Sequence, residues 1–149
     1  MEARLKNPTM LLPDVMPAIQ SLLGATYKAG VPAATLALVH LRASQINGCH
    51  LCLETGICHA QAAGETDERL FAIAGWRTAG CFAPAERAAL ALTESVTTLS
   101  TENPVPDEVW SEAAKYYDET GLAALLLAIT MANMFNRFNI ATRQVEATW

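Results

Sequence analysis

The chain of 149 residues is long enough for one domain, and its 52% hydrophobic content is enough for a core without disulfide or metal staples. Its formal net charge is −5 and no basic run is longer than a pair, which excludes a sequence-independent nucleic-acid binder with a Lys/Arg-rich face. This composition favours an acidic small-molecule enzyme or a soluble oligomer.

The N-terminal residues 1–8 alternate charged and apolar side chains, and they lack the uninterrupted apolar core of a secretory signal. We therefore expect a cytoplasmic protein. The most apolar run, residues 122–135, is interrupted by Thr130 and Asn133, which makes it too short and too polar to span a bilayer. It predicts a buried helix, and we expect no membrane partner.

Apolar residues recur at helical spacing along most of the chain, and glycine or proline separates the runs. Gly30 ends the first predicted helix, Pro32 opens the second, and Thr66 supplies an N-cap for the fourth. No segment alternates convincingly with period two, so we predict an all-α fold of about six to eight helices in one domain, residues 1–149. The predicted helices cover residues 12–29, 32 to 45–48, 49–63, 66–76, 85–100, 107–117 and 122–141.

Two cysteines lie three residues apart at a predicted helix start. If Gly48 lets the chain turn into a helix near Cys49, the sulfurs of Cys49 and Cys52 fall on one face, close to unpaired backbone N–H groups and the positive end of the helix dipole. That field lowers a thiol pKa and favours the nucleophilic thiolate. In a cytoplasmic chain, a C-x-x-C pair of this kind indicates redox chemistry or metal binding.

A resemblance to a known family covers most of the chain. The motifs that carry it are LRASQINGCHLC at residues 41–52, AGET at 63–66, WR at 76–77, ERAALA at 86–91, VPDEV at 105–109 and NMFNRFN at 133–139. In this order they resemble the AhpD-like (alkyl hydroperoxidase D-like) branch of the carboxymuconolactone decarboxylase superfamily. The resemblance implies an all-helical fold that forms homo-oligomers, commonly trimers or hexamers, with the C-x-x-C at the start of a central helix.

The resemblance also implies a thiol peroxidase or disulfide oxidoreductase. Cys52 would attack a hydroperoxide or a partner's disulfide, Cys49 would resolve the product as a disulfide, and a dithiol such as dihydrolipoamide would restore both thiols. Active members usually carry a proton relay, a His four residues after the second Cys and a Glu twelve residues before the first. This chain has Gly56 and Ala37 there, so an active thiol pair needs another base.

All three histidines of the chain lie near the C-x-x-C motif. His40 is the preferred replacement base, because the resemblance places its helix against the C-x-x-C helix. His59 shares a helical face with Cys52 but lies seven residues further on, a rise of about 10 Å, so it could act only through water, substrate or another subunit. His50 is expected to point away from the sulfurs, where it could pair with Glu54. The candidate catalytic residues are therefore Cys52, Cys49, His40 and His59.

Other readings of the same residues stay open. A zinc site made by the two thiols with His59 or His40 is disfavoured, because His59 is a helical turn too far to close a tetrahedron, and we expect no metal and no cofactor. Cys58 and Cys81 are expected to be small buried residues, although Cys81 could lie in a loop. A non-catalytic or small-ligand-binding homo-oligomer is the main alternative, and a carboxymuconolactone decarboxylase-type enzyme is a third.

Overall fold

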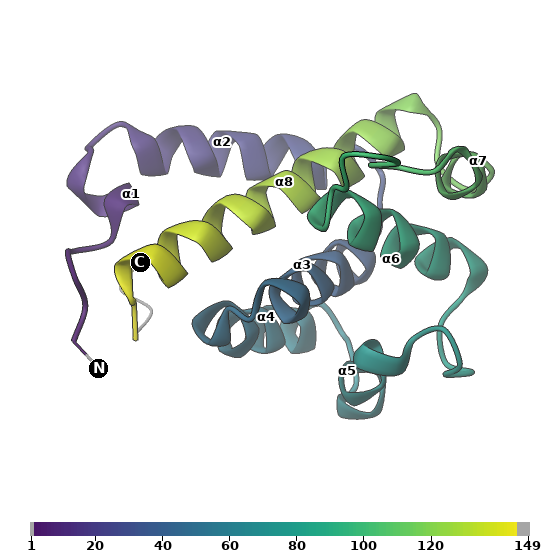
Figure 1. Ribbon diagram of the computed structural model, residues 1–149, viewed down its shortest axis with the longest axis horizontal. Helices are drawn as coiled ribbons and strands as arrows, with labels where there is room; N and C mark the ends of the chain where they lie inside the picture. The colour runs from purple at the N-terminus through teal and green to yellow at the C-terminus, as the bar shows by residue number, and fades with distance from the viewer. Residues whose placement is uncertain (1, 146–149) are drawn as a thin grey trace.

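The computed structural model describes residues 2–145, and these form an all-α domain without strands (Figure 1). It has eight α-helices and one short 3-10 helix, η1, in agreement with the predicted fold class. The elements are α1 (Pro8–Leu11), α2 (Val15–Tyr27), α3 (Ala33–Asn47), α4 (His50–Ala62), α5 (Asp67–Ala72), η1 (Ile73–Gly75), α6 (Pro84–Thr97), α7 (Asp107–Ala114) and α8 (Glu119–Thr142).

Most helix ends fall where glycine and capping residues predict them. Gly30 follows α2 and Gly48 follows α3, both with positive φ (84° and 68°), a conformation that costs glycine no side-chain strain. Thr66 caps α5 through a hydrogen bond that its side chain accepts from the backbone N–H of Arg69. The α8 helix begins earlier than predicted, because the Asp118 side chain accepts a hydrogen bond from its first turn.

Two local features differ from the sequence prediction. The four-residue α1 was not predicted, and it forms because the Asn7 side chain accepts a hydrogen bond from the backbone N–H of Thr9. The helix predicted over residues 66–76 stops at α5 and continues as η1, since Gly75 has low helix propensity and the tighter turn leaves Ile73 and Trp76 buried.

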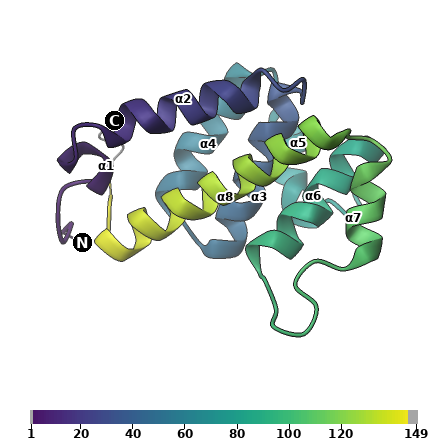
Figure 2. The ribbon, with the colours of Figure 1, turned by 90° about the horizontal axis from the view of Figure 1, so that it is seen from above.

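Helix α3 lies at the centre and packs against α4, α6 and α8. In Figures 1 and 2, α8 crosses the molecule diagonally, with α2 along one side and α7 near one end. Two apolar clusters hold these helices together, one joining α3 to α6 and α8 and the other joining α3 to α4, η1 and α6. Their fully buried side chains include Val39, Leu92, Leu125 and Ile129 in the first and Leu38, Leu41, Ile73 and Leu90 in the second.

A polar cluster centred on Glu94 fixes α3 against α6. The carboxylate accepts hydrogen bonds from Arg42 on α3 and from the Trp76 indole, both at 2.8 Å, and it pairs with Arg77 at 2.5 Å. Burial alone would raise the pKa of Glu94, but the hydrogen bonds from Arg77, Trp76 and Arg42 outweigh it and the net pKa is lowered. Glu94 therefore stays ionised at neutral pH and holds the helix that carries His40.

Helix α8 is long and apolar enough, by length and composition, to cross a membrane, with a mean hydropathy of 1.3. However, 44% of its most apolar stretch is buried inside the domain, and the core helix of a globular protein passes the same test. Its buried face includes Leu125 and Ile129 in the apolar core and, further along, Asn136 and Asn139. The polar residues at this end of α8 face the C-x-x-C turn.

Candidate functional site

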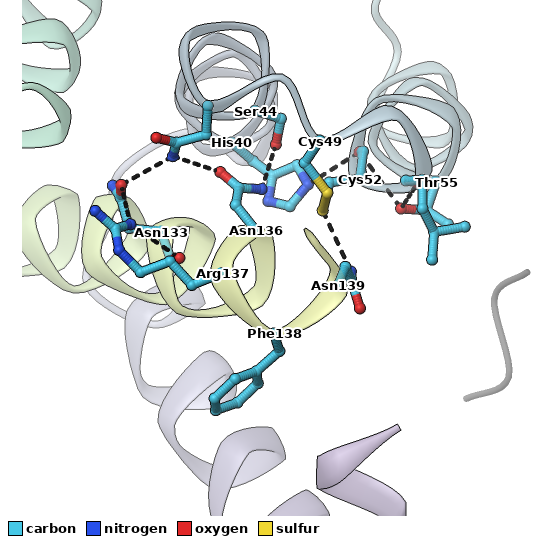
Figure 3. The surroundings of a disulfide bond; sticks show 12 residues. His40, Ser44, Cys49, Cys52, Thr55, Asn133, Asn136, Arg137, Phe138 and Asn139 are labelled. Carbon is cyan, nitrogen blue, oxygen red and sulfur yellow. Dashed lines mark hydrogen bonds between the residues drawn. A yellow bond between two sulfur atoms is a disulfide. The ribbon is translucent and has the colours of Figure 1, made fainter. Parts of the chain in front are cut away.

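The C-x-x-C pair lies at the junction of α3 and α4, as predicted. Gly48 ends α3 in the left-handed conformation, Cys49 is the N-cap of α4, and Cys52 lies in its first turn. The two sulfurs form a disulfide, and each cysteine is only 2% exposed (Figure 3). The sequence correctly indicated a thiol pair at a helix start, and the structure adds that the pair is buried.

A network of side-chain amides fastens this junction to α8. The Asn47 amide nitrogen donates to Asn133 Oδ1 at 2.9 Å and to Asn136 Oδ1 at 2.8 Å. Asn136 in turn donates to Ser44 Oγ at 3.0 Å, and the contact lies inside the core. Because Ser44 and Asn47 form the last turn of α3, these bonds hold the position of the turn that leads into Cys49.

Asn139, one helical turn beyond Asn136, contacts the cysteine pair itself. Its Nδ2 lies 3.3 Å from Cys52 Sγ, and the residue is 3% exposed (Figure 3). Asn139 was not among the residues predicted to form the site, although it belongs to the NMFNRFN segment at residues 133–139. The available signal was the three-residue spacing of Asn133, Asn136 and Asn139, which puts polar amides on one face of an apolar helix.

The His40 side chain contacts the backbone of Cys52. Its Nε2 lies 3.3 Å from the Cys52 carbonyl oxygen, and because a carbonyl can only accept, Nε2 carries the proton and donates it. Burial lowers the pKa of His40, the hydrogen bond to Cys52 opposes this, and the nearby His59 adds to the lowering. At neutral pH the imidazole is therefore uncharged, with Nδ1 as its basic nitrogen.

The His40 ring lies directly against Gly56. A Cβ atom built on Gly56 would lie 2.8 Å from His40 Cδ2 and 2.9 Å from Leu41 Cδ2, closer than real Cβ atoms come to other atoms. The imidazole thus fills the space beside α4 into which a side chain at position 56 would project. Position 56 is the relay position that lacks a histidine in this chain, and the structure places a different histidine, His40, beside it.

The other two histidines occupy different surroundings. His59 is exposed and lines the same cleft as His40 and Cys52. The His50 side chain is 86% exposed and its Nε2 lies 3.1 Å from Glu54 Oε1, which agrees with the expected pairing away from the sulfurs. The structure therefore brings Cys49, Cys52 and His40 together, keeps His59 at the cleft wall and leaves His50 outside.

An apolar cleft of about 790 Å³ opens onto Cys52 between α2, α3, α4 and α8. Cys52, His40 and Asn139 supply polar groups to its wall, and Ala37 and Gly56 line it as well. No Lys, Arg, Asp or Glu is among the described residues that line it. Its apolar lining includes Met16, Ile19, Leu23, Leu36, Met131 and Phe135.

The remaining cysteines lie apart from this cleft. Cys58 is exposed, contrary to the expectation of a buried residue, because it lies on the outward face of α4, which no helix within residues 2–145 covers. Cys81 is half-buried in the loop before α6. Within residues 2–145, no three His, Cys, Asp or Glu side chains converge to form a metal-binding group.

Solved structures of two proteins share the fold. A protein of unknown function from Agrobacterium tumefaciens, described as a candidate antioxidant defence protein AhpD, superposes with a TM-score of 0.87 over 99% of this chain and 100% of its own, at 23% identity. The debrominase Bmp8 superposes with a TM-score of 0.78 over 91% of this chain and 73% of its own, at 24% identity. A further Bmp8 structure, a cysteine-to-alanine variant holding 2,3,4-tribromopyrrole, has a TM-score of 0.75.

Sequence comparisons define the family. The uncharacterized protein YdfG of Bacillus subtilis is 31% identical over 131 residues, which is 88% of each chain. The uncharacterized protein YnjA of Escherichia coli is 32% identical over 105 residues, 70% of this chain and 56% of its own. The profile of the carboxymuconolactone decarboxylase family matches residues 13–95, which include α3 and the C-x-x-C motif. The chain therefore belongs to the carboxymuconolactone decarboxylase family and has an AhpD-like fold.

Proposed function

We propose that this protein is a thiol peroxidase that reduces small, uncharged organic hydroperoxides with the Cys49–Cys52 pair. The observation that carries the proposal is the position of Cys52, which forms a disulfide with Cys49 and lines an apolar cleft of about 790 Å³. A cleft of this size suits a small organic molecule. A buried thiol on the wall of such a cleft reacts with molecules that are small enough to enter the cleft.

The proposed cycle balances with one dithiol consumed for each hydroperoxide. The Cys52 thiolate attacks the terminal oxygen of the hydroperoxide, so that an S–O bond forms, the O–O bond breaks and the alkoxide leaves with a proton as the alcohol. The Cys49 thiol then displaces the hydroxyl group of the Cys52 sulfenic acid, which gives the disulfide and water. A small dithiol reduces the disulfide by thiol–disulfide exchange.

His40 is the base in this proposal. Its lowered pKa keeps the imidazole neutral at pH 7, so it can accept the proton of a thiol and pass it to the leaving alkoxide. Its hydrogen bond to the Cys52 carbonyl fixes it beside the motif, and it lies in the space at Gly56. We infer that the base, which in active family members is a histidine at the position of Gly56 on α4, is supplied in this chain by His40 on α3. His59, exposed on the cleft wall, is a candidate to relay the proton onward to solvent.

The surroundings of Cys52 favour a small substrate over the other candidates. Cys52 is 2% exposed, which argues against a disulfide on a folded partner as the substrate. A carboxymuconolactone is an anion, and no cationic Lys or Arg is among the described residues around the cleft to bind its carboxylates. An uncharged hydroperoxide meets neither obstacle.

The test is steady-state consumption of cumene hydroperoxide with dihydrolipoamide as reductant. We expect Cys52→Ser to abolish turnover and Cys49→Ser to stop after one turnover with Cys52 oxidised to the sulfenic acid, visible by mass spectrometry. Cys58→Ser is the matched control, since Cys58 is exposed and outside the cleft, and it should keep native turnover. Equal turnover in the native protein and Cys52→Ser would overturn the proposal.

Reductive dehalogenation is a second candidate for the same thiols. The cleft is apolar, and the fold is shared with a debrominase whose variant binds 2,3,4-tribromopyrrole. In such a reaction two thiols become a disulfide while a carbon–bromine bond becomes a carbon–hydrogen bond and bromide leaves. Bromide release from tribromopyrrole, dependent on Cys52, would select this reaction. Tight binding of either compound without any turnover in the native protein would instead favour the non-catalytic, ligand-binding alternative.

We also propose a homo-oligomer, a trimer or hexamer, as the family resemblance implies, and a cytoplasmic location. Several large apolar side chains are exposed on the single chain, and an assembly would cover them. They include Met10, Leu12, Phe71 and Leu99. The mass under native conditions tests the assembly, and a monomer would contradict it.

A further inference from the structure

The orientation of the Asn139 amide is fixed by the sulfur beside it. A disulfide sulfur carries no hydrogen and can only accept, so the amide places Nδ2 toward Cys52 Sγ, 3.3 Å away. The amide oxygen must then point in the other direction, away from the sulfur, as Figure 3 shows. This oxygen is buried, and it has no hydrogen-bond partner among the described residues.

The unpartnered oxygen distinguishes Asn139 from its neighbours on α8. Asn136 is also buried, yet its oxygen accepts from Asn47 and its nitrogen donates to Ser44. Asn133 is likewise bonded at both amide atoms. Of these three asparagines, Asn139 alone has an amide atom without a hydrogen-bond partner among the described residues. A buried polar atom without a partner lowers the stability of the fold. Asn139 and Cys52 both line the cleft, so a molecule bound beside Cys52 lies next to this amide.

We propose that Asn139 is a catalytic residue that binds the two reacting groups at once. Its N–H stabilises the Cys52 thiolate, and its C=O accepts a hydrogen bond from the O–H of the bound hydroperoxide. This inference rests on the proposed peroxidase function and adds to it the recognition of the terminal hydroxyl group. The site thereby selects hydroperoxides, which have an O–H group, over peroxides in which both oxygens carry carbon.

The amide keeps both contacts while the bonds change. The thiolate attacks the terminal oxygen while that oxygen keeps its hydrogen, so the O–H that Asn139 holds becomes the O–H of the Cys52 sulfenic acid. The O–O electron pair leaves with the alkoxide, which takes its proton from His40. One side chain therefore aligns sulfur and oxygen for attack, which lowers the entropy cost of bringing them together.

The donor contact predicts the acidity of Cys52. A hydrogen bond to a charged sulfur is much stronger than one to a neutral disulfide sulfur, so removing it should raise the Cys52 pKa by about one unit. The measurement is the pH dependence of iodoacetamide alkylation at Cys52, followed by peptide mass spectrometry in the Cys49→Ser background. Asn139→Ala should raise the pKa, and Asn139→Asp should raise it further, because a carboxylate repels a thiolate. An unchanged pKa in both variants would overturn the inference.

Asn136→Ala is the matched control. It removes a buried amide one turn away on the same helix face that bonds to α3 rather than to sulfur. It should lower stability while leaving the Cys52 pKa within a few tenths of a unit of native. An equal rise of the pKa in Asn136→Ala and Asn139→Ala would mean that loosening of α8, rather than the Asn139 N–H, is responsible, and would overturn the proposal.

The acceptor contact is tested with compounds that do not react. Cumyl alcohol has a hydroxyl group and its methyl ether does not, so the native reduced protein should bind the alcohol about tenfold more tightly than the ether. In Asn139→Leu this preference should vanish, and its persistence would refute the acceptor role. Neither experiment requires turnover. If Cys52→Ser retains turnover while Asn139 still controls the Cys52 pKa and alcohol binding, the peroxidase function fails and the Asn139 contacts stand.

Discussion

Replacing Gly56 by alanine puts a methyl group where the His40 ring lies. In a helix interior, Gly→Ala ordinarily stabilises a protein by about 0.5–1 kcal/mol, because glycine has the greater backbone entropy to lose. Here the new Cβ would lie 2.8 Å from His40 Cδ2 and 2.9 Å from Cδ2 of the buried Leu41. Overpacking of this kind costs about 1–3 kcal/mol, so the net expectation is a loss of about 1 kcal/mol.

Gly24 provides the same substitution without the clash. It also lies inside a helix, α2, and a Cβ built there meets no atom within 4 Å. Urea unfolding should therefore show Gly24→Ala stabilised by about 0.5–1 kcal/mol and Gly56→Ala destabilised. In the His40→Ala background, Gly56→Ala should cost less than in the native protein, by about 1 kcal/mol of coupling. If Gly56→Ala stabilises as much as Gly24→Ala, the imidazole does not fill this space.

Three further predictions concern stability. The pKa of His40 is lowered in the folded state, so the protein folds best with this imidazole neutral, above pH 6.5. Below pH 6.5 the free energy of unfolding should fall by at most about 1.4 kcal/mol per pH unit. Urea unfolding at several pH values should show this slope in the native protein and not in His40→Gln. Asp118→Ala should cost about 1 kcal/mol, since the carboxylate accepts from Gly121 N–H at 2.8 Å, and an unchanged urea midpoint would contradict this. The Cys49–Cys52 disulfide closes only a short loop, so its reduction should cost at most about 2 kcal/mol of stability. Circular dichroism should show the reduced protein still helical, and unfolding on reduction would refute this.

The sequence predicted most of what is local. Glycine and proline mark the helix breaks, and Gly48 correctly predicted the turn that presents Cys49 as the N-cap of α4. These features depend on backbone preferences within a few residues, which a sequence displays directly. The pairing of His50 with Glu54, four residues apart on one helix, was predictable for the same reason.

Contacts between segments that are distant in the chain could not be predicted from the sequence. Asn139 and Cys52 are 87 residues apart, and the sequence of an apolar helix does not predict which buried sulfur the amide of Asn139 will contact. Likewise the sequence placed His40 near the motif, but only the packing of α3 on α4 shows the ring against Gly56. Cys58 was expected to be buried by its residue type, whereas its exposure depends on whether another helix covers that face of α4.

The burial of both cysteines constrains the order of events in the proposed cycle. Cys49 and Cys52 are each 2% exposed, and Cys52 is reached from the cleft. In the proposed cycle, the hydroperoxide and the dithiol would both reach Cys52 through this cleft, so the alcohol would have to leave before the reductant could approach the sulfur. The proposed cycle therefore predicts double-displacement kinetics, in which an excess of reductant slows the reaction by occupying the cleft that the hydroperoxide has to enter.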